Sequence, residues 1–136
     1  MARRKRYEEL ERDNGTIVRY EPHENGGGMV ATGAQVAKEA YVAATAWVDP
    51  GATIAAGARL GDHVWVEDDA SIARGARVGS HAHIGRGASI GLGARVGERA
   101  TVGTAVLVEP HASVEPQSAV ADGTVVHRRA GYVTAA

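Results

Sequence analysis

Aliphatic residues recur at every sixth position along most of the chain. Val, Ile or Leu occupies seventeen successive positions at this spacing, namely 30, 36, 42, 48, 54, 60, 66, 72, 78, 84, 90, 96, 102, 108, 114, 120 and 126. The residue two positions before each of them is nearly always small, most often Ala. A period of six fits neither helical period but is a multiple of the two-residue strand period. We therefore expect both members of each pair to face inward and the residues between them to face outward.

Glycine and proline mark the boundaries between these short units. Glycine often stands three positions after the aliphatic residue, as at Gly57, Gly75 and Gly93, and Pro50 and Pro110 occupy the position just before this one. Such residues are typical of tight turns. The sequence therefore predicts an internal repeat of short strands joined by corners, in an all-β chain.

The units Ala88-Ser89-Ile90-Gly91 and Ala94-Arg95-Val96-Gly97 resemble the hexapeptide-repeat family, which includes bacterial acyltransferases and γ-class carbonic anhydrases. The resemblance implies a left-handed parallel β-helix, in which three hexads make one triangular coil of eighteen residues. The match covers about residues 28–132, which predicts nearly six coils about 4.8 Å apart. We divide the chain into an arm and hinge (1–27), the β-helix (28–132) and a C-terminal tail (133–136).

The residues before the repeat have a different character. Residues 1–13 run from a basic block to an acidic one, and Arg4 and Glu8 have the spacing of a helical pair, which favours a short helix or an arm. Residues 16–20 are typical of a strand, and residues 25–28 of a flexible hinge. We expect the arm to pack on a neighbouring subunit or a protein partner, and Tyr132 to close the last coil.

Composition narrows the function classes. The chain has 136 residues, 44% of them apolar, and no cysteine, which excludes disulfides, thiol nucleophiles and cysteine-based zinc sites. Its 15 basic and 16 acidic side chains give no global attraction to nucleic acid or an anionic membrane. It contains no long apolar stretch and no signal peptide. We therefore expect a soluble protein, cytoplasmic or virion-associated, with neither a membrane nor a nucleic-acid partner.

Outward residues eighteen apart should stack in columns. Trp47 and Trp65 form one such pair, and because exposed tryptophan is costly we expect both in the interface of a parallel homotrimer. On another face Arg59, Arg77 and Arg95 should stack, either as a solvated charge ladder or as a contact for an anion or partner.

The histidines are the remaining candidates for chemistry. His63 and His81 share a corner phase one coil apart, and His83 lies on the strand after His81. Three imidazoles at this range are a candidate zinc site. The resemblance to γ-class carbonic anhydrases fails in detail, because that family separates two of its histidines by four residues and here one residue lies between His81 and His83.

Two functions from different classes remain. The main hypothesis is a non-catalytic, self-associating structural protein without a cofactor, a rigid trimer that docks to a larger assembly through its arm, as in capsid decoration at a virion surface. The alternative, implied by the resemblance, is an acyltransferase with His81 as general base and acyl-CoA between two prisms. We favour the first because the repeat has no inserted loop to shape an acceptor pocket.

Overall fold

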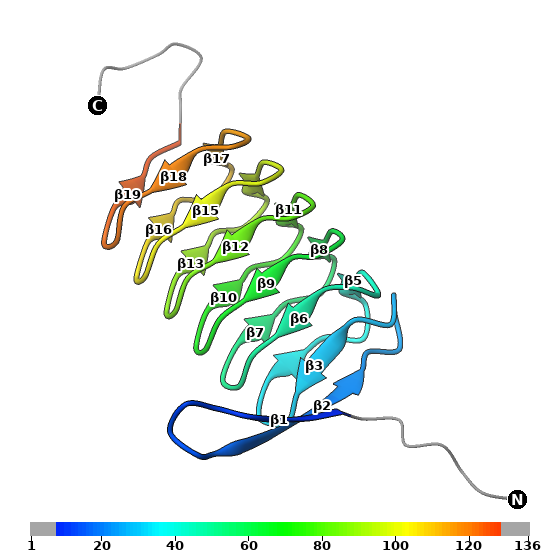
Figure 1. The fold of residues 1–136 in the computed structure, drawn as a ribbon. Coiled ribbons are helices and arrows are strands. Elements are labelled where there is room, and N and C mark those ends of the chain that lie inside the picture. Colours follow the sequence, from blue (N-terminus) through cyan, green and yellow to red (C-terminus); the bar gives the residue numbers. More distant parts are fainter. Residues whose placement is uncertain (1–7, 129–136) are drawn as a thin grey trace, which may run out of the picture.

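The structure, a computed structural model, describes residues 8–128 and forms a left-handed parallel β-helix with a hairpin at its N-terminal end (Figure 1). Three short strands make each turn, and there are about five turns, with β18 and β19 beginning another. This confirms the fold class that the six-residue repeat predicts. No helix among the described residues has the length and hydrophobicity that crossing a bilayer requires.

The strands form three flat sheets, one on each face of the prism. The eight-stranded sheet contains β1 (Glu8–Glu11), β2 (Ile17–Pro22), β3 (Met29–Ala31), β6 (Trp47–Val48), β9 (Trp65–Val66), β12 (His83–Ile84), β15 (Thr101–Val102) and β18 (Ala119–Val120). The six-stranded sheet contains β4 (Gln35–Val36), β7 (Thr53–Ile54), β10 (Ser71–Ile72), β13 (Ser89–Ile90), β16 (Leu107–Val108) and β19 (Val125–Val126). The five-stranded sheet contains β5 (Tyr41–Val42), β8 (Arg59–Leu60), β11 (Arg77–Val78), β14 (Arg95–Val96) and β17 (Ser113–Val114).

Residues eighteen apart stand directly opposite each other in neighbouring turns. In the eight-stranded sheet Ile84 pairs with Val66 inside the prism, while His83 pairs with Trp65 on its outer face. The inward positions are fully buried throughout the middle turns, for example Leu60 and its small partner Ala58, both 0% exposed. The core is therefore a narrow column of small and aliphatic side chains, which explains why the chain needs no Phe.

The corners require one residue in the left-handed backbone region. Glycine supplies it at Gly57 (φ 76°), but His63 (φ 58°) and His81 (φ 65°) adopt the same conformation with a full side chain. Non-glycine residues with positive φ are uncommon and carry a cost in conformational energy. The corner position, three residues after each aliphatic residue, thus accommodates side chains other than glycine, and these project outward from the edge of the prism.

From residue 8 onward, the N-terminal segment forms a hairpin and not the short helix that its charge spacing allowed. Strand β1 pairs antiparallel with β2, and β2 pairs antiparallel with β3 of the first coil, so the hairpin extends the eight-stranded sheet (Figure 1). Val18 and Tyr20 alternate inward and pack with Ala31. A helix is wrong for residues 8–11, because β2 hydrogen-bonds to the strand edge of the first coil and β1 pairs with β2 in turn. The strand predicted over 16–20 is confirmed.

The hairpin therefore packs on the chain's own first coil. The hinge after it is tight: a Cβ on Gly28 would lie 2.2 Å from Cγ1 of Val42, so only glycine fits there. The expected capping role of Tyr132 falls outside the described residues, as do residues 1–7. Docking of the arm on a partner remains a prediction.

Candidate functional site

An open groove of about 820 Å³ separates the hairpin turn from the outer face of the eight-stranded sheet. Residues 10–14 line one side, and Trp47, Trp65 and Glu67 line the other. From the sequence we expected no segment that could form the wall of a pocket, because the repeat has no inserted loop. That expectation is corrected by the N-terminal hairpin, which supplies the missing wall.

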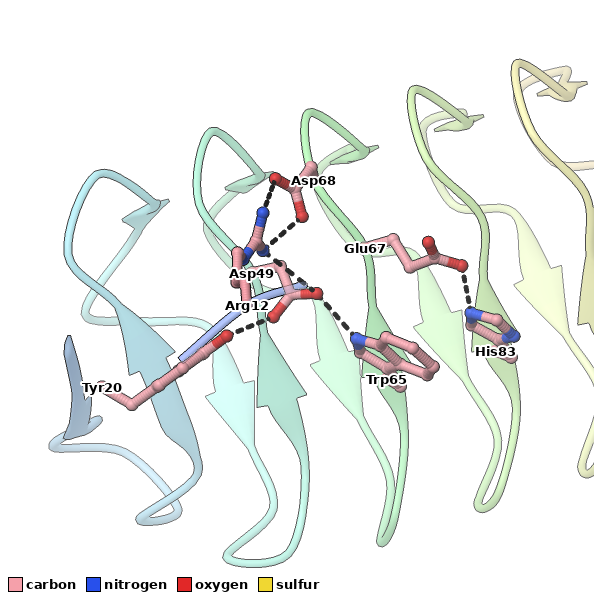
Figure 2. Close-up of polar contacts among 7 residues, drawn as sticks. All are labelled: Arg12, Tyr20, Asp49, Trp65, Glu67, Asp68 and His83. Atoms are coloured by element: carbon pink, nitrogen blue, oxygen red, sulfur yellow. Dashed lines mark hydrogen bonds and ion pairs between the residues drawn. The ribbon is translucent and has the colours of Figure 1, made fainter. Parts of the chain in front are cut away.

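An imidazole and a carboxylate meet beside this groove. Nε2 of His83, on β12, faces Oε2 of Glu67, which follows β9 one turn earlier (Figure 2). Nε2 is shielded from solvent, although each side chain as a whole is about a third exposed (34% and 30%). The contact becomes an ion pair when His83 is protonated. Nδ1, which faces away from Glu67, is the ring nitrogen left to exchange a proton with a bound molecule.

The ring of His83 is held on its other side by an aromatic neighbour. The indole of Trp65 lies parallel to the imidazole, with 4.5 Å between ring centroids and 4° between ring planes. Such stacking restricts rotation of the imidazole.

A buried carboxylate holds Trp65 in turn. Asp49, only 7% exposed, accepts hydrogen bonds from Nε1 of Trp65 (2.8 Å) and from the hydroxyl of Tyr20 (2.7 Å) (Figure 2). Burial, together with the hydrogen bond to Asp49, raises the pKa of Tyr20 to about 12. Asp49 therefore joins the N-terminal hairpin to the turn that carries Trp65.

A second contact ties the hairpin turn to the prism. Both terminal nitrogens of Arg12 donate hydrogen bonds to the two oxygens of Asp68, each at 2.6 Å. The hydrogen bonds from Arg12 lower the pKa of Asp68, and the same pairing raises the pKa of Arg12 further above its ordinary value. Paired guanidinium and carboxylate groups of this geometry are the stronger kind of ion pair. Arg12 thus fixes the wall of the groove against the next corner.

The three histidines of the candidate zinc site do not converge on one point. His63 and His81 stack on the exposed corner, with 4.8 Å between ring centroids, whereas His83 is engaged by Trp65 and Glu67. Residues 8–128 contain no group of three or more His, Asp or Glu side chains arranged to hold a metal ion. Of the three, His63 lines the groove, and His81 and His83 do not.

The two predicted tryptophan interface residues differ in their surroundings. Trp47 is half-buried and meets Tyr20 edge to face, at 4.9 Å between ring centroids, so it serves packing within the chain. Trp65 is 46% exposed. Their place in a trimer interface remains a prediction.

The predicted arginine column is present. Arg59, Arg77 and Arg95 pair in register on the five-stranded sheet and line a shallow groove of about 480 Å³. The guanidinium of Arg59 lies 4.6 Å from the ring centroid of Tyr41. None of the ion pairs found within residues 8–128 involves these three arginines.

Sequence reasoning did not place Tyr20, Asp49 and Arg12 in the site. A signal for Asp49 was nevertheless present. From residue 31 to residue 103, the position after each aliphatic residue is Ala or Gly, with Asp49 and Glu67 as the exceptions. Two carboxylates one turn apart thus replace the usual Ala or Gly, while the six-residue spacing of the repeat is kept. The contacts of Arg12 had no such signal.

The solved structures that resemble this chain include several acetyltransferases. One is PerB from Caulobacter crescentus in complex with CoA and GDP-perosamine, 28% identical over 73% of this chain and 48% of that chain, with a TM-score of 0.45. Another is the acetyltransferase domain of PglB from Neisseria gonorrhoeae, 26% identical over 71% and 52%, with a TM-score of 0.40. A third is the serine acetyltransferase CysE of the same organism in complex with serine, 20% identical over 66% and 37%, with a TM-score of 0.49.

This chain spans about half the length of the first two of these structures. No protein-family model matches the sequence, and neither does any curated protein.

Our main hypothesis, a non-catalytic structural or capsid-decorating protein, is wrong. It rested on the absence of any part that could shape a site, whereas the solved structures that resemble this chain include acetyltransferases. The hairpin also supplies the wall that we thought missing. With an aliphatic residue at every sixth position and three parallel sheets, the chain is a β-solenoid of the hexapeptide-repeat type.

Proposed function

We propose that this chain transfers an acyl group from acyl-CoA to a hydroxyl or amine acceptor, with His83 as general base. The observation that carries this proposal is the contact between Nε2 of His83 and the Glu67 carboxylate. Glu67 lines the groove, which has room for an acceptor, and His83 lies behind Glu67 and Trp65, outside the set of lining residues. A histidine oriented by a carboxylate is the usual proton acceptor in acyl transfer.

Each group has a definite part in the reaction. Glu67 favours the tautomer with the proton on Nε2, so that Nδ1 of His83 carries a lone pair. Nδ1 removes the proton of the acceptor N–H or O–H as the acceptor attacks the thioester carbonyl. The new C–N or C–O bond forms, the C–S bond breaks, and the imidazolium returns the proton to the departing thiolate. The products are the acylated acceptor and free CoA.

The surroundings of His83 stabilise the charge that this step creates. The imidazolium would lie between the Glu67 carboxylate and the face of the Trp65 indole. A carboxylate and an indole face both attract a cation, and neither is itself changed by the reaction. General acid–base catalysis of this kind contributes about 10² to 10⁴ in rate.

His83 fits this role better than His81, the residue that the acyltransferase alternative named as general base. His81 stacks on His63 at an exposed corner and has no carboxylate contact among the ion pairs of residues 8–128. His81→Ala is therefore a discriminating variant and a test of the earlier assignment.

The proposal is tested by release of free CoA from acetyl-CoA, followed with a thiol reagent. The chain has no cysteine, so the protein itself contributes no background. Acceptors to assay first are an amino-sugar nucleotide and serine, and mass spectrometry identifies the acetylated product. We expect Glu67→Gln to lower kcat at least about tenfold, while Glu98→Gln, an exposed matched change, leaves it unchanged. Absence of acceptor-dependent CoA release, or full activity in Glu67→Gln, would contradict the proposal.

A further inference from the structure

We propose that Asp49 is a positioning residue that fixes the orientation of His83 through Trp65. The inference rests on the proposed function in assigning His83 as the base, but its central claim concerns geometry and is measurable without turnover. Asp49 makes no hydrogen bond or ion pair with His83 or Glu67 among the contacts described above. It binds the indole of Trp65, which in turn stacks on His83.

The buried position of Asp49 requires an explanation. A carboxylate that is 7% exposed loses most of its hydration, a loss tolerated only when hydrogen bonds replace it. Each of its oxygens accepts one hydrogen bond from an aromatic side chain, Oδ1 from Tyr20 and Oδ2 from Trp65. The guanidinium of Arg12 is the nearest cation, 3.8 Å away. The two hydrogen bonds to the carboxylate therefore come from two different strands, β2 through Tyr20 and β9 through Trp65.

The consequence for Trp65 is a fixed indole plane. Trp65 is 46% exposed, so burial alone leaves its side chain free to change rotamer. The hydrogen bond from Nε1 to Asp49 removes that freedom. Because the plane lies only 4° from that of the imidazole, turning the indole would break the stack on His83.

The consequence for His83 is a fixed direction for each ring nitrogen. With the imidazole held flat against Trp65, Nε2 stays directed at Glu67 and Nδ1 stays directed away from it (Figure 2). Displacement of a catalytic group by about 1 Å can lower a rate by about a hundredfold. Loss of Asp49 should therefore lower kcat while leaving acceptor binding nearly intact.

A double-mutant cycle separates this role from a merely structural one. Asp49→Asn keeps the size of the side chain but loses one of its two accepted hydrogen bonds. Trp65→Phe keeps a ring on His83 but removes the donor. If Asp49 acts through Trp65, each change lowers kcat about tenfold or more with KM for the acceptor changed less than about twofold, and the double variant is no worse than the worse single one. Asp62→Asn, at an exposed corner, is the matched control and keeps full kcat.

The second readout is independent of activity. A ring stacked on an indole has its proton NMR signals displaced upfield, and His83→Ala identifies the signals of His83. We expect Asp49→Asn to move them toward the positions of an exposed histidine such as His111. Tyr20→Phe also breaks a hydrogen bond to Asp49, so it serves as the comparison for lost stability, and it should leave these signals in place.

The two readouts distinguish the possible failures. If the wild type releases no CoA but Asp49→Asn moves the His83 signals, the proposed function fails and the positioning role stands. If the signals stay in place in folded Asp49→Asn protein, or the effects of Asp49→Asn and Trp65→Phe on kcat are additive, the positioning role is overturned whatever the activity.

Discussion

Trp65 and His83 lie directly opposite each other on adjacent parallel strands, with their rings stacked 4.5 Å apart. The eighteen-residue repeat produces this pairing, because one complete turn brings the chain back to the same face. A fold that places every outward residue above its counterpart can assemble a site from side chains far apart in sequence. The stack is therefore both a product of the repeat and a part of the proposed site.

The ion pair between Arg12 and Asp68 predicts a loss of stability in acid. Because the pKa of Asp68 is lowered in the folded chain, its stabilisation is fully present above the ordinary carboxyl pKa, about 4, and is lost as the pH falls through the lower folded value. We expect Tm to fall more steeply below about pH 4 in the wild type than in Arg12→Ala. Arg74→Ala, an exposed control, should retain the wild-type slope. If Tm falls equally with pH in the wild type and in Arg12→Ala, the ion pair between Arg12 and Asp68 does not stabilise the fold.

Tyr20 predicts the opposite dependence at alkaline pH. Its folded pKa is raised to about 12, so its stabilisation is complete below the ordinary tyrosine pKa, about 10, and is lost as the pH rises through the folded value. Absorbance of the phenolate should show one tyrosine ionising about two pH units later than the others. That late step should disappear in Tyr20→Phe. A single titration of all tyrosines near pH 10 would show that Tyr20 is not buried against Asp49.

The narrow core should respond strongly to truncation. Ile84 is 0% exposed, and Ile84→Ala should lower the free energy of unfolding by about 2 to 5 kcal/mol, because a cavity remains where the side chain packed. Ile84→Asp should not fold, since a carboxylate has no partner there. Leu92→Ala, at a position 47% exposed, should change the stability by less than about 0.5 kcal/mol. Chemical denaturation gives these values, and a folded Ile84→Asp protein of wild-type stability would contradict the core assignment.

The parallel homotrimer remains to be tested. Light scattering after size exclusion should give three times the chain mass of 14.1 kDa. Trp65→Arg should weaken the assembly if the exposed indole is in the interface. Trp47 is less suitable for this test, because its contact with Tyr20 makes a charged replacement destabilise the chain itself. A monomeric wild type would rule out the trimer.

The fold was predictable from sequence because every inward position in the repeat carries an aliphatic residue that has to be buried. Seventeen aliphatic residues in one phase leave no other period that buries them together. The hairpin was not predictable in the same way, since β1 is exposed at all four positions and owes its conformation to pairing with β2. Strand β2 was recognisable, because Val18 and Tyr20 alternate with polar residues.

The site was only partly predictable for a related reason. Stacking of residues eighteen apart follows from the repeat. This spacing predicts that His63 lies next to His81 and Trp65 next to His83, and both pairs are stacked in the structure. Contacts that cross from one register position to another, such as Glu67 with His83, depend on side-chain rotamers that the period does not specify. Contacts from the hairpin, such as Arg12 with Asp68, bridge 56 residues and lie outside the repeat altogether.

The most direct test of the central claim is acceptor-dependent CoA release by His83→Ala and His81→Ala, measured side by side at saturating acetyl-CoA. With His83 as general base, we expect His83→Ala to lose about 10²-fold or more in kcat and to keep its affinity for acetyl-CoA, while His81→Ala stays within about twofold of the wild type. Equal activity of the two variants, or loss of turnover in His81→Ala alone, would contradict the account.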